Sequence, residues 1–142
     1  MRPAELISKR ESLINSIKTN WNRIELFNTV TKGVTRDFDI IALYEQIKKD
    51  SIELVKTKVA IQAINMGLKS LEELPENSLY PAIYMLQQIK EQKVKLLRVK
   101  TSGSDVIITR KKQEQLLKEL DIESVKLADT IDKFNKENDF KM

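Results

Sequence analysis

Apolar side chains recur at helical spacing near the start of the chain. Ile7, Ile14 and Trp21 lie seven residues apart, and further apolar residues with the same spacing widen this stripe. Such spacing places side chains on one face of an α-helix. Pro3 suits the first turn of that helix, where its missing N–H costs no hydrogen bond. The pattern predicts a first helix over residues 3–27.

A second stripe follows after a short break and predicts a helix over residues 39–66. Its members share seven-residue spacing and are Ile40, Ile47, Leu54 and Ile61. Asp39 is the expected N-cap of this helix, and Gly67 is a natural stop after its end. A helix of that length extends roughly 40 Å. We expect its stripe to be too long for one copy of this chain to cover.

The second half of the chain predicts two more helices, over residues 78–100 and 110–137. Ser78 is the expected cap of the third helix, with Pro81 in its first turn. The fourth helix has a potential interruption at Asp121. The expected buried face of the third helix is Leu79, Ala82, Ile83, Leu86, Ile89, Leu96 and Leu97.

The segments between the helices carry weaker patterns. Ser70 and Glu73 have the spacing of a capping box on a short turn. The β-branched residues of segment 29–35 favour a loop, a small hairpin, or a strand that pairs with segment 105–109. At most a minor β element is therefore expected beside the helices.

Together these elements predict a mainly α protein with a single domain over residues 1–142. Four helices with seven-residue apolar spacing favour a long-helix bundle with coiled-coil-like packing. Long apolar stripes on a small chain usually pair with another copy of that chain. We therefore expect a homo-oligomer, either a dimer or a multiple of dimers.

Composition restricts the chemistry of this protein. The chain has 142 residues and contains neither Cys nor His. These absences remove thiolate and imidazole nucleophiles, bases and metal ligands, so that any metal site would need carboxylates alone. No calcium-loop motif is present. We expect no enzymatic activity, no cofactor and no metal centre.

Charge and hydropathy indicate the environment and the partners. The beginning of the chain lacks the apolar run of a signal peptide, and no stretch is long enough to predict a membrane span. We expect a cytoplasmic protein that does not contact membranes. The net charge of +4 favours anionic partners, but it is too weak for a dedicated nucleic-acid binder.

A basic pair at the start of the last predicted helix is the main candidate binding site. Arg110 and Lys111 follow a Gly-Ser loop, and free N–H groups at a helix N-terminus can hold an anion beside such cations. Arg23 or Arg36 from a neighbouring copy would complete the site. The simpler interpretation is a solvated basic patch.

Three further polar or aromatic residues allow two interpretations each. Asn20 and Asn65 fall on or near positions expected to be buried, where an amide either fixes helix register or holds a ligand. Trp21 lies on the apolar stripe, so core packing is the simpler explanation and ligand stacking the alternative. Asn65 is included among the candidate ligand-binding residues.

Four patches of the chain resemble a family of small helical bacterial proteins described as septicolysin-like. They are the spacing of Ile7, Arg10, Leu13 and Ile17; the motif Ala63-Ile64-Asn65; the run from Ser78 to Leu96; and the spacing of Leu127, Ile131 and Asn135. The chain departs from that family at Leu86-Gln87, where the family has an Arg-Asp pair. The resemblance implies an oligomeric helical fold and no reaction.

Two functions are consistent with these observations. The first is a non-enzymatic oligomer that captures a small anionic, nucleotide-like ligand between its subunits, as a phage counter-defence sponge for signalling nucleotides in the host cytoplasm would do. The alternative is a structural module that presents helical faces to another protein. Converging cations and amides in a pocket would favour the first, and an exposed apolar groove the second.

Overall fold

The computed structural model describes residues 1–76 and 78–137, and these residues form a mainly helical fold. The four long helices are α1 (Pro3–Phe27), α2 (Ile40–Asn65), α3 (Tyr80–Arg98) and α4 (Arg110–Glu137). Their order and approximate bounds confirm the helices predicted from the sequence. Coiled-coil-like packing and the oligomeric state remain predictions.

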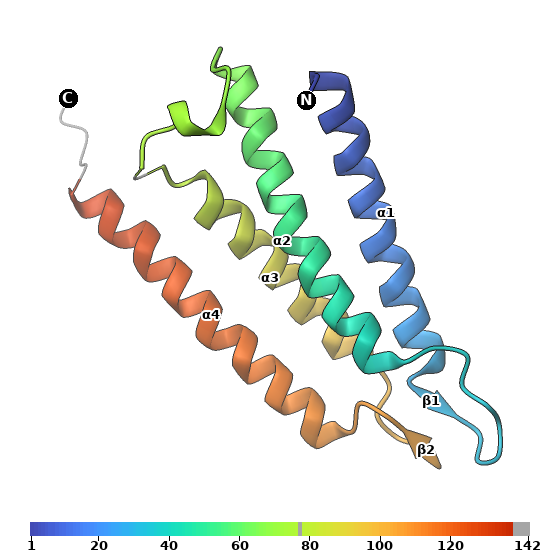
Figure 1. The fold of residues 1–142 in the computed structure, drawn as a ribbon. Coiled ribbons are helices and arrows are strands. Elements are labelled where there is room, and N and C mark those ends of the chain that lie inside the picture. Colours follow the sequence, from blue (N-terminus) through green and yellow to red (C-terminus); the bar gives the residue numbers. More distant parts are fainter. Residues whose placement is uncertain (77, 138–142) are drawn as a thin grey trace.

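The helices run alternately up and down, and each packs against the next along the chain (Figure 1). Strands β1 (Thr29–Val30) and β2 (Asp105–Val106) form a two-stranded antiparallel sheet at one end of the molecule, which we call the sheet end. The N-terminus and the 3-10 helix η1 (Leu71–Glu73) lie at the opposite end, the far end. The pairing of segments 29–35 and 105–109 is thus confirmed over two residues of each.

Local signals explain where α2 begins and ends. The Asp39 side chain accepts a hydrogen bond of 3.1 Å from the backbone N–H of Ala42, which satisfies one free donor of the first turn. At the other end, Gly67 adopts a φ of +81°, and the N–H of Leu68 donates to the carbonyl of Ala63. Only glycine adopts this left-handed conformation readily, so Gly67 closes α2 as the sequence predicted.

Three details of the predicted elements are wrong. Helix α3 begins at Tyr80, and Leu79 rather than Ser78 is its N-cap, with no side-chain hydrogen bond there. Ser70 forms no capping bond either, and the Glu73 carboxylate accepts from the N–H of Lys69 rather than from that of Ser70. Helix α4 continues through Asp121 without interruption. Polar residues near a helix start are therefore weaker guides than the apolar stripe.

The hydrophobic core lies toward the sheet end, where all four helices converge. Its buried members come from the second half of α1, the first half of α2, the later part of α3, the connection between α3 and α4, and the first half of α4. They are Trp21, Ile24, Ile40, Tyr44, Ile47, Ile89, Leu96, Val99, Ile108, Leu116 and Leu120.

Buried polar bonds tie the loops together at the sheet end. Asn28 is only 1% exposed; its amide donates to the carbonyls of Lys100 and Ile108, and its Oδ1 accepts from the N–H of Ile108. The guanidinium of Arg36 donates to the carbonyls of Phe27, Asn28 and Asp105. Because these bonds join both connecting loops, they fix how the two helical hairpins approach each other.

A single chain covers most of the α2 stripe, which is more than the sequence predicted. Ile40, Ile47 and Leu54 are at most 2% exposed within a single chain, because α1 and α3 cover them. The fourth member of the stripe, Ile61, is only partly buried, so one chain covers the first three members. The predicted face of α3 also differs from the observed one: Leu97 is 67% exposed, and Ile83 is exposed as well.

Candidate functional site

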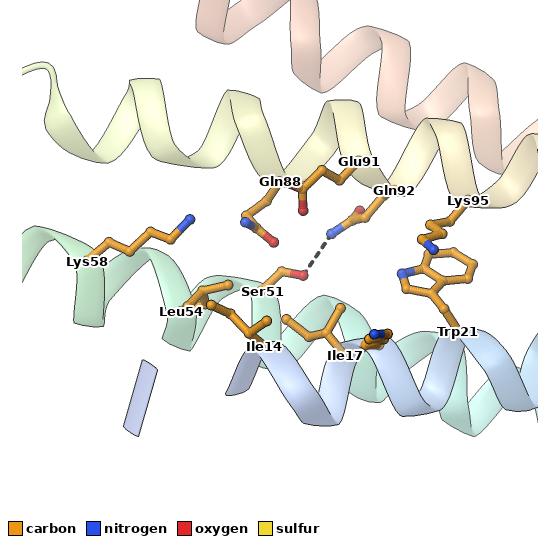
Figure 2. Close-up of a pocket in the computed structure, with 11 residues that line it drawn as sticks. Ile14, Ile17, Trp21, Ser51, Leu54, Lys58, Gln88, Glu91, Gln92 and Lys95 are labelled. Atoms are coloured by element: carbon orange, nitrogen blue, oxygen red, sulfur yellow. Dashed lines mark hydrogen bonds between the residues drawn. The ribbon is translucent and has the colours of Figure 1, made fainter. Parts of the chain in front are cut away.

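A cavity of about 300 Å³ lies between α1, α2 and α3, and we call it the chamber (Figure 2). Each of the three helices supplies three or four lining residues. They are Ile14, Ile17, Lys18 and Trp21 from α1, Ser51, Leu54 and Lys58 from α2, and Gln88, Glu91, Gln92 and Lys95 from α3. A volume of that order is at the small end of the range for ligand pockets.

Helical spacing explains why α1 presents an apolar wall to the chamber. Ile14, Ile17 and Trp21 are separated by three and four residues, so they share one face of α1. Trp21 is 2% exposed and meets the ring of Tyr44 edge to face, with ring centroids 6.0 Å apart. This contact holds the indole in place at one end of the chamber.

A buried polar pair joins α2 to α3 beside the chamber. The hydroxyl of Ser51 donates to the carbonyl of Ile47, so its oxygen accepts the 3.0 Å hydrogen bond from Nε2 of Gln92. This arrangement leaves Oε1 of Gln92 buried with no donor among the described residues. The amide of Gln92 is therefore fixed in one orientation.

Two other polar groups at the chamber form no hydrogen bond with any described residue: the side-chain amide of Gln88 and the indole N–H of Trp21. Both residues are 2% exposed. In Figure 2 the Gln88 amide extends from α3 toward Ser51 and Leu54, and the indole nitrogen of Trp21 is on the side of the ring that faces the chamber. The buried side-chain atoms without a partner in the described part of the chain do not include either group, so both are open to the chamber, where a hydrogen-bonding ligand can reach them.

The charged residues around the chamber are mostly cationic. Lys18, Lys58 and Lys95 form no salt bridge within the described part of the chain, and Glu91 is the one acidic residue that lines the cavity there. Lys58 instead lies over the ring of Tyr84, 5.9 Å from its centroid. Because ammonium groups only donate, the chamber offers more donors than acceptors.

Arg110 and Lys111 lie elsewhere, at the sheet end where α4 begins. Both are exposed, and Nε of Arg110 lies 3.5 Å from a carboxylate oxygen of Glu114. Thr109 already caps this helix start by accepting a 3.2 Å hydrogen bond from the N–H of Lys112. That cap occupies one of the free N–H groups of the helix start, and the site predicted at these residues stays a prediction.

Arg36 and Arg23 are also at the sheet end, where each already has partners. The guanidinium of Arg36 donates hydrogen bonds to three backbone carbonyls and to the carboxylate of Asp105, and its side chain is only 13% exposed. Arg23 donates to Oδ1 of Asn20 and stacks 4.7 Å over the ring of Phe38. These contacts assign both arginines to the packing of loops and helices in the single chain.

Asn65 lies at the far end, as the last residue of α2. Its side chain is exposed, in contrast to the expectation that it is buried, whereas Asn20 is buried as expected. Asn65 lines a second hollow of about 270 Å³, together with Arg10, Lys58, Ile61, Gln62 and Tyr84. The structure therefore does not gather the five predicted ligand-binding residues at one place.

The polar residues of the chamber were not predicted from the sequence, although two of them interrupt an apolar stripe. Ser51 interrupts the apolar stripe of α2 between Ile47 and Leu54, and Gln92 interrupts that of α3 between Ile89 and Leu96. A polar side chain at such a position marks a buried hydrogen bond or a ligand contact.

Comparisons with protein-family models, curated proteins and solved structures find no match for this chain. The septicolysin-like resemblance therefore stays an expectation from sequence. Among the described residues, no helix combines the length and apolar character needed to cross a membrane. Residues 1–76 and 78–137 also contain no group of three or more acidic side chains placed to bind a metal ion.

Proposed function

We propose that this protein is a non-enzymatic binding protein that captures a small organic anion in the chamber between α1, α2 and α3. The observation that carries the proposal is the pair of polar groups, on Gln88 and Trp21, that face the chamber and have no hydrogen-bond partner among the described residues. A ligand with hydrogen-bonding edges would satisfy both groups. The rest of the wall is apolar enough to hold a ring or a short hydrocarbon body.

The electrostatics of the chamber favour a negative ligand. Lys18, Lys58 and Lys95 lack acidic partners within the described residues, so an anion would not have to displace an existing salt bridge. The enclosed side of the chamber also lowers the local dielectric, which strengthens attraction between a lysine and an anion. Glu91 can accept a hydrogen bond from an amino group on the same ligand.

A nucleotide-like molecule combines these properties, because it carries a flat ring with amide-like edges and a phosphate group. The chain offers no His or Cys to attack such a ligand, so a bound nucleotide would be released unchanged. Sequestration without chemistry is the behaviour expected of a sponge for signalling nucleotides, and a phage protein acting in a host cytoplasm is the setting we favour.

We also propose that the protein self-associates, and an exposed apolar face of α3, rather than the α2 stripe, supports this. Ile83, Val94 and Leu97 are exposed and spaced so that they share one face of α3. A second copy would cover that face. Changing Val94 to Asp should therefore lower the sedimentation coefficient without unfolding the chain, whereas Ile47→Asp should unfold it because Ile47 is fully buried.

A helical interaction module remains the second candidate, favoured by a different feature. A hollow of about 430 Å³ lies between α2 and the 71–81 segment, and its lining is largely apolar, including Val55, Val59, Leu71 and Leu74. Such a surface suits the apolar face of a partner helix. Leu71 is exposed, so Leu71→Ser should weaken that partner's binding and leave the chamber unchanged.

Fluorescence tests the chamber directly, because Trp21 is the single tryptophan of the chain. Adenosine 5′-monophosphate and benzoate serve as probes, and each should shift or quench the emission of the wild-type protein. Gln88→Leu should abolish the response, and Arg110→Ala should leave it unchanged. If Arg110→Ala abolishes it and Gln88→Leu does not, the ligand binds at the start of α4 and the chamber proposal is wrong.

A further inference from the structure

The chamber and the second hollow share one residue, Lys58, which lines both. Ser51 and Asn65 each lie seven residues from Lys58 along α2, which corresponds to about 10 Å of helix on either side. The two cavities therefore succeed one another along the groove that α2 forms with α1 and α3. A ligand longer than the chamber would extend past Lys58 into the second hollow.

The residues that line the second hollow are suited to binding an anion. Arg10 comes from α1, Lys58, Gln62 and Asn65 come from α2, and no acidic residue is among its lining residues. A guanidinium, an ammonium and two amides together supply donors from several directions. The apolar part of the wall is limited to Ile61 and the ring of Tyr84.

The donor side chains of the second hollow make only weak contacts within the chain, so a ligand can replace these contacts at little cost. Arg10 approaches one oxygen of its neighbour Glu11 at 3.4 Å, and the Glu11 side chain is 58% exposed. Exposed ion pairs of this kind contribute about 0–1 kcal/mol. Gln62 donates a long 3.4 Å hydrogen bond to the hydroxyl of Tyr80. Among residues 1–76 and 78–137, Lys58 contacts the ring of Tyr84 and forms no salt bridge.

We infer that the second hollow is a phosphate subsite and that the ligand of the chamber is an elongated organic phosphate. This inference rests on the proposed function: the ring lies in the chamber, and the phosphate lies between Arg10, Lys58 and Asn65. A phosphate monoester presents three terminal oxygens, so it can use donors from both α1 and α2 at once. A carboxylate, with two oxygens, leaves part of this donor set unused.

Calorimetry with three probes separates the subsite from the chamber: adenosine 5′-monophosphate, adenosine and inorganic phosphate. The wild-type protein should bind the monophosphate at least about tenfold more tightly than adenosine, a difference of about 1.4 kcal/mol. Arg10→Gln should remove most of this difference without changing adenosine binding. Asn65→Ala should reduce it, and Lys111→Gln, at the opposite end of the molecule, is the matched control.

Each outcome bears on a different claim. Equal affinities for adenosine and its monophosphate, both lowered by Gln88→Leu and neither altered by Arg10→Gln, would overturn the phosphate subsite while the chamber stands. Binding of inorganic phosphate as tight as that of the monophosphate would overturn the elongated ligand, because the second hollow would then bind phosphate without any contribution from a ring in the chamber. Failure of every probe to respond to Gln88→Leu would overturn the proposed function itself.

Discussion

The amide nitrogen of Gln92 lies 3.0 Å from the hydroxyl oxygen of Ser51, and this hydrogen bond joins α3 to α2 inside an otherwise apolar layer. The two residues are at most 2% exposed. Because the Ser51 hydrogen is already directed at the carbonyl of Ile47, the serine oxygen is the acceptor that Gln92 needs. The pair therefore sets the distance between two walls of the chamber.

Because of this hydrogen bond, we expect substitutions of Ser51 and Gln92 to have unequal effects on the free energy of unfolding. Ser51→Ala leaves the Gln92 amide without an acceptor and should lower the free energy of unfolding by about 1–3 kcal/mol. Gln92→Met leaves the Ser51–Ile47 bond intact and also removes the unpartnered Oε1, so it should be nearly neutral. Urea denaturation of both single variants and the double variant measures this. A Gln92→Met variant less stable than Ser51→Ala would contradict the assignment.

Tyr44 carries a buried hydroxyl with no hydrogen-bond partner among the described residues. Phenylalanine at this position keeps the ring contact with Trp21 and removes the unpaired oxygen. Tyr44→Phe should therefore raise the free energy of unfolding at neutral pH, by up to about 1 kcal/mol. Chemical denaturation at pH 7 provides the comparison, and a clear loss of stability would show that the hydroxyl has a partner.

The same residue predicts a dependence on alkaline pH. Burial raises the pKa of the Tyr44 phenol above its ordinary value of 10.0, and the negative charges of Glu119 and Glu123 raise it further. Because the folded state disfavours ionisation, the wild-type protein should lose stability as the pH rises above 10, where the unfolded chain releases this proton. The stability difference between Tyr44→Phe and wild type should therefore widen above pH 10 and remain constant between pH 7 and 9. A difference that narrows at high pH would contradict the raised pKa.

Arg36 is expected to act in stability and not in ligand binding. Its planar guanidinium donates hydrogen bonds to the backbone carbonyls of three residues. The single ammonium group of lysine cannot form all three of these hydrogen bonds in the same geometry. Arg36→Lys should lower the free energy of unfolding by about 2 kcal/mol. Arg110→Lys, at an exposed position, is the control and should change it by less than about 0.5 kcal/mol. If Arg36→Lys instead weakened probe binding and left stability unchanged, Arg36 would belong to a ligand site.

The sequence predicted the helices well because their signals are local. The apolar stripe, the Asp39 cap and the Gly67 stop act within one or two turns, and the structure confirms all three. Pairing of the two short strands was one of the three alternatives that the β-branched residues of segment 29–35 left open. These features depend on neighbouring residues and not on how the helices are arranged in space.

The candidate site was not predictable in the same way. An apolar stripe shows which face of a helix is buried, but not where neighbouring helices diverge and leave a cavity. The sequence therefore could not show that Gln88 faces the chamber, or that carbonyl groups of distant loops occupy the guanidinium of Arg36. It also could not show that α1 and α3 cover the α2 stripe, which depends on the packing of three helices.

Native mass spectrometry of protein purified from cells under non-denaturing conditions, compared between wild type and Gln88→Leu, tests the central claim most directly. Leucine has no polar group to leave unpaired, so the variant should fold with equal or higher stability. We expect the wild-type protein to retain an organic anion, or to bind added adenosine 5′-monophosphate, and the variant to do neither. Equal retention by both proteins, or a wild-type protein that neither carries nor takes up a ligand, would contradict a binding site in the chamber.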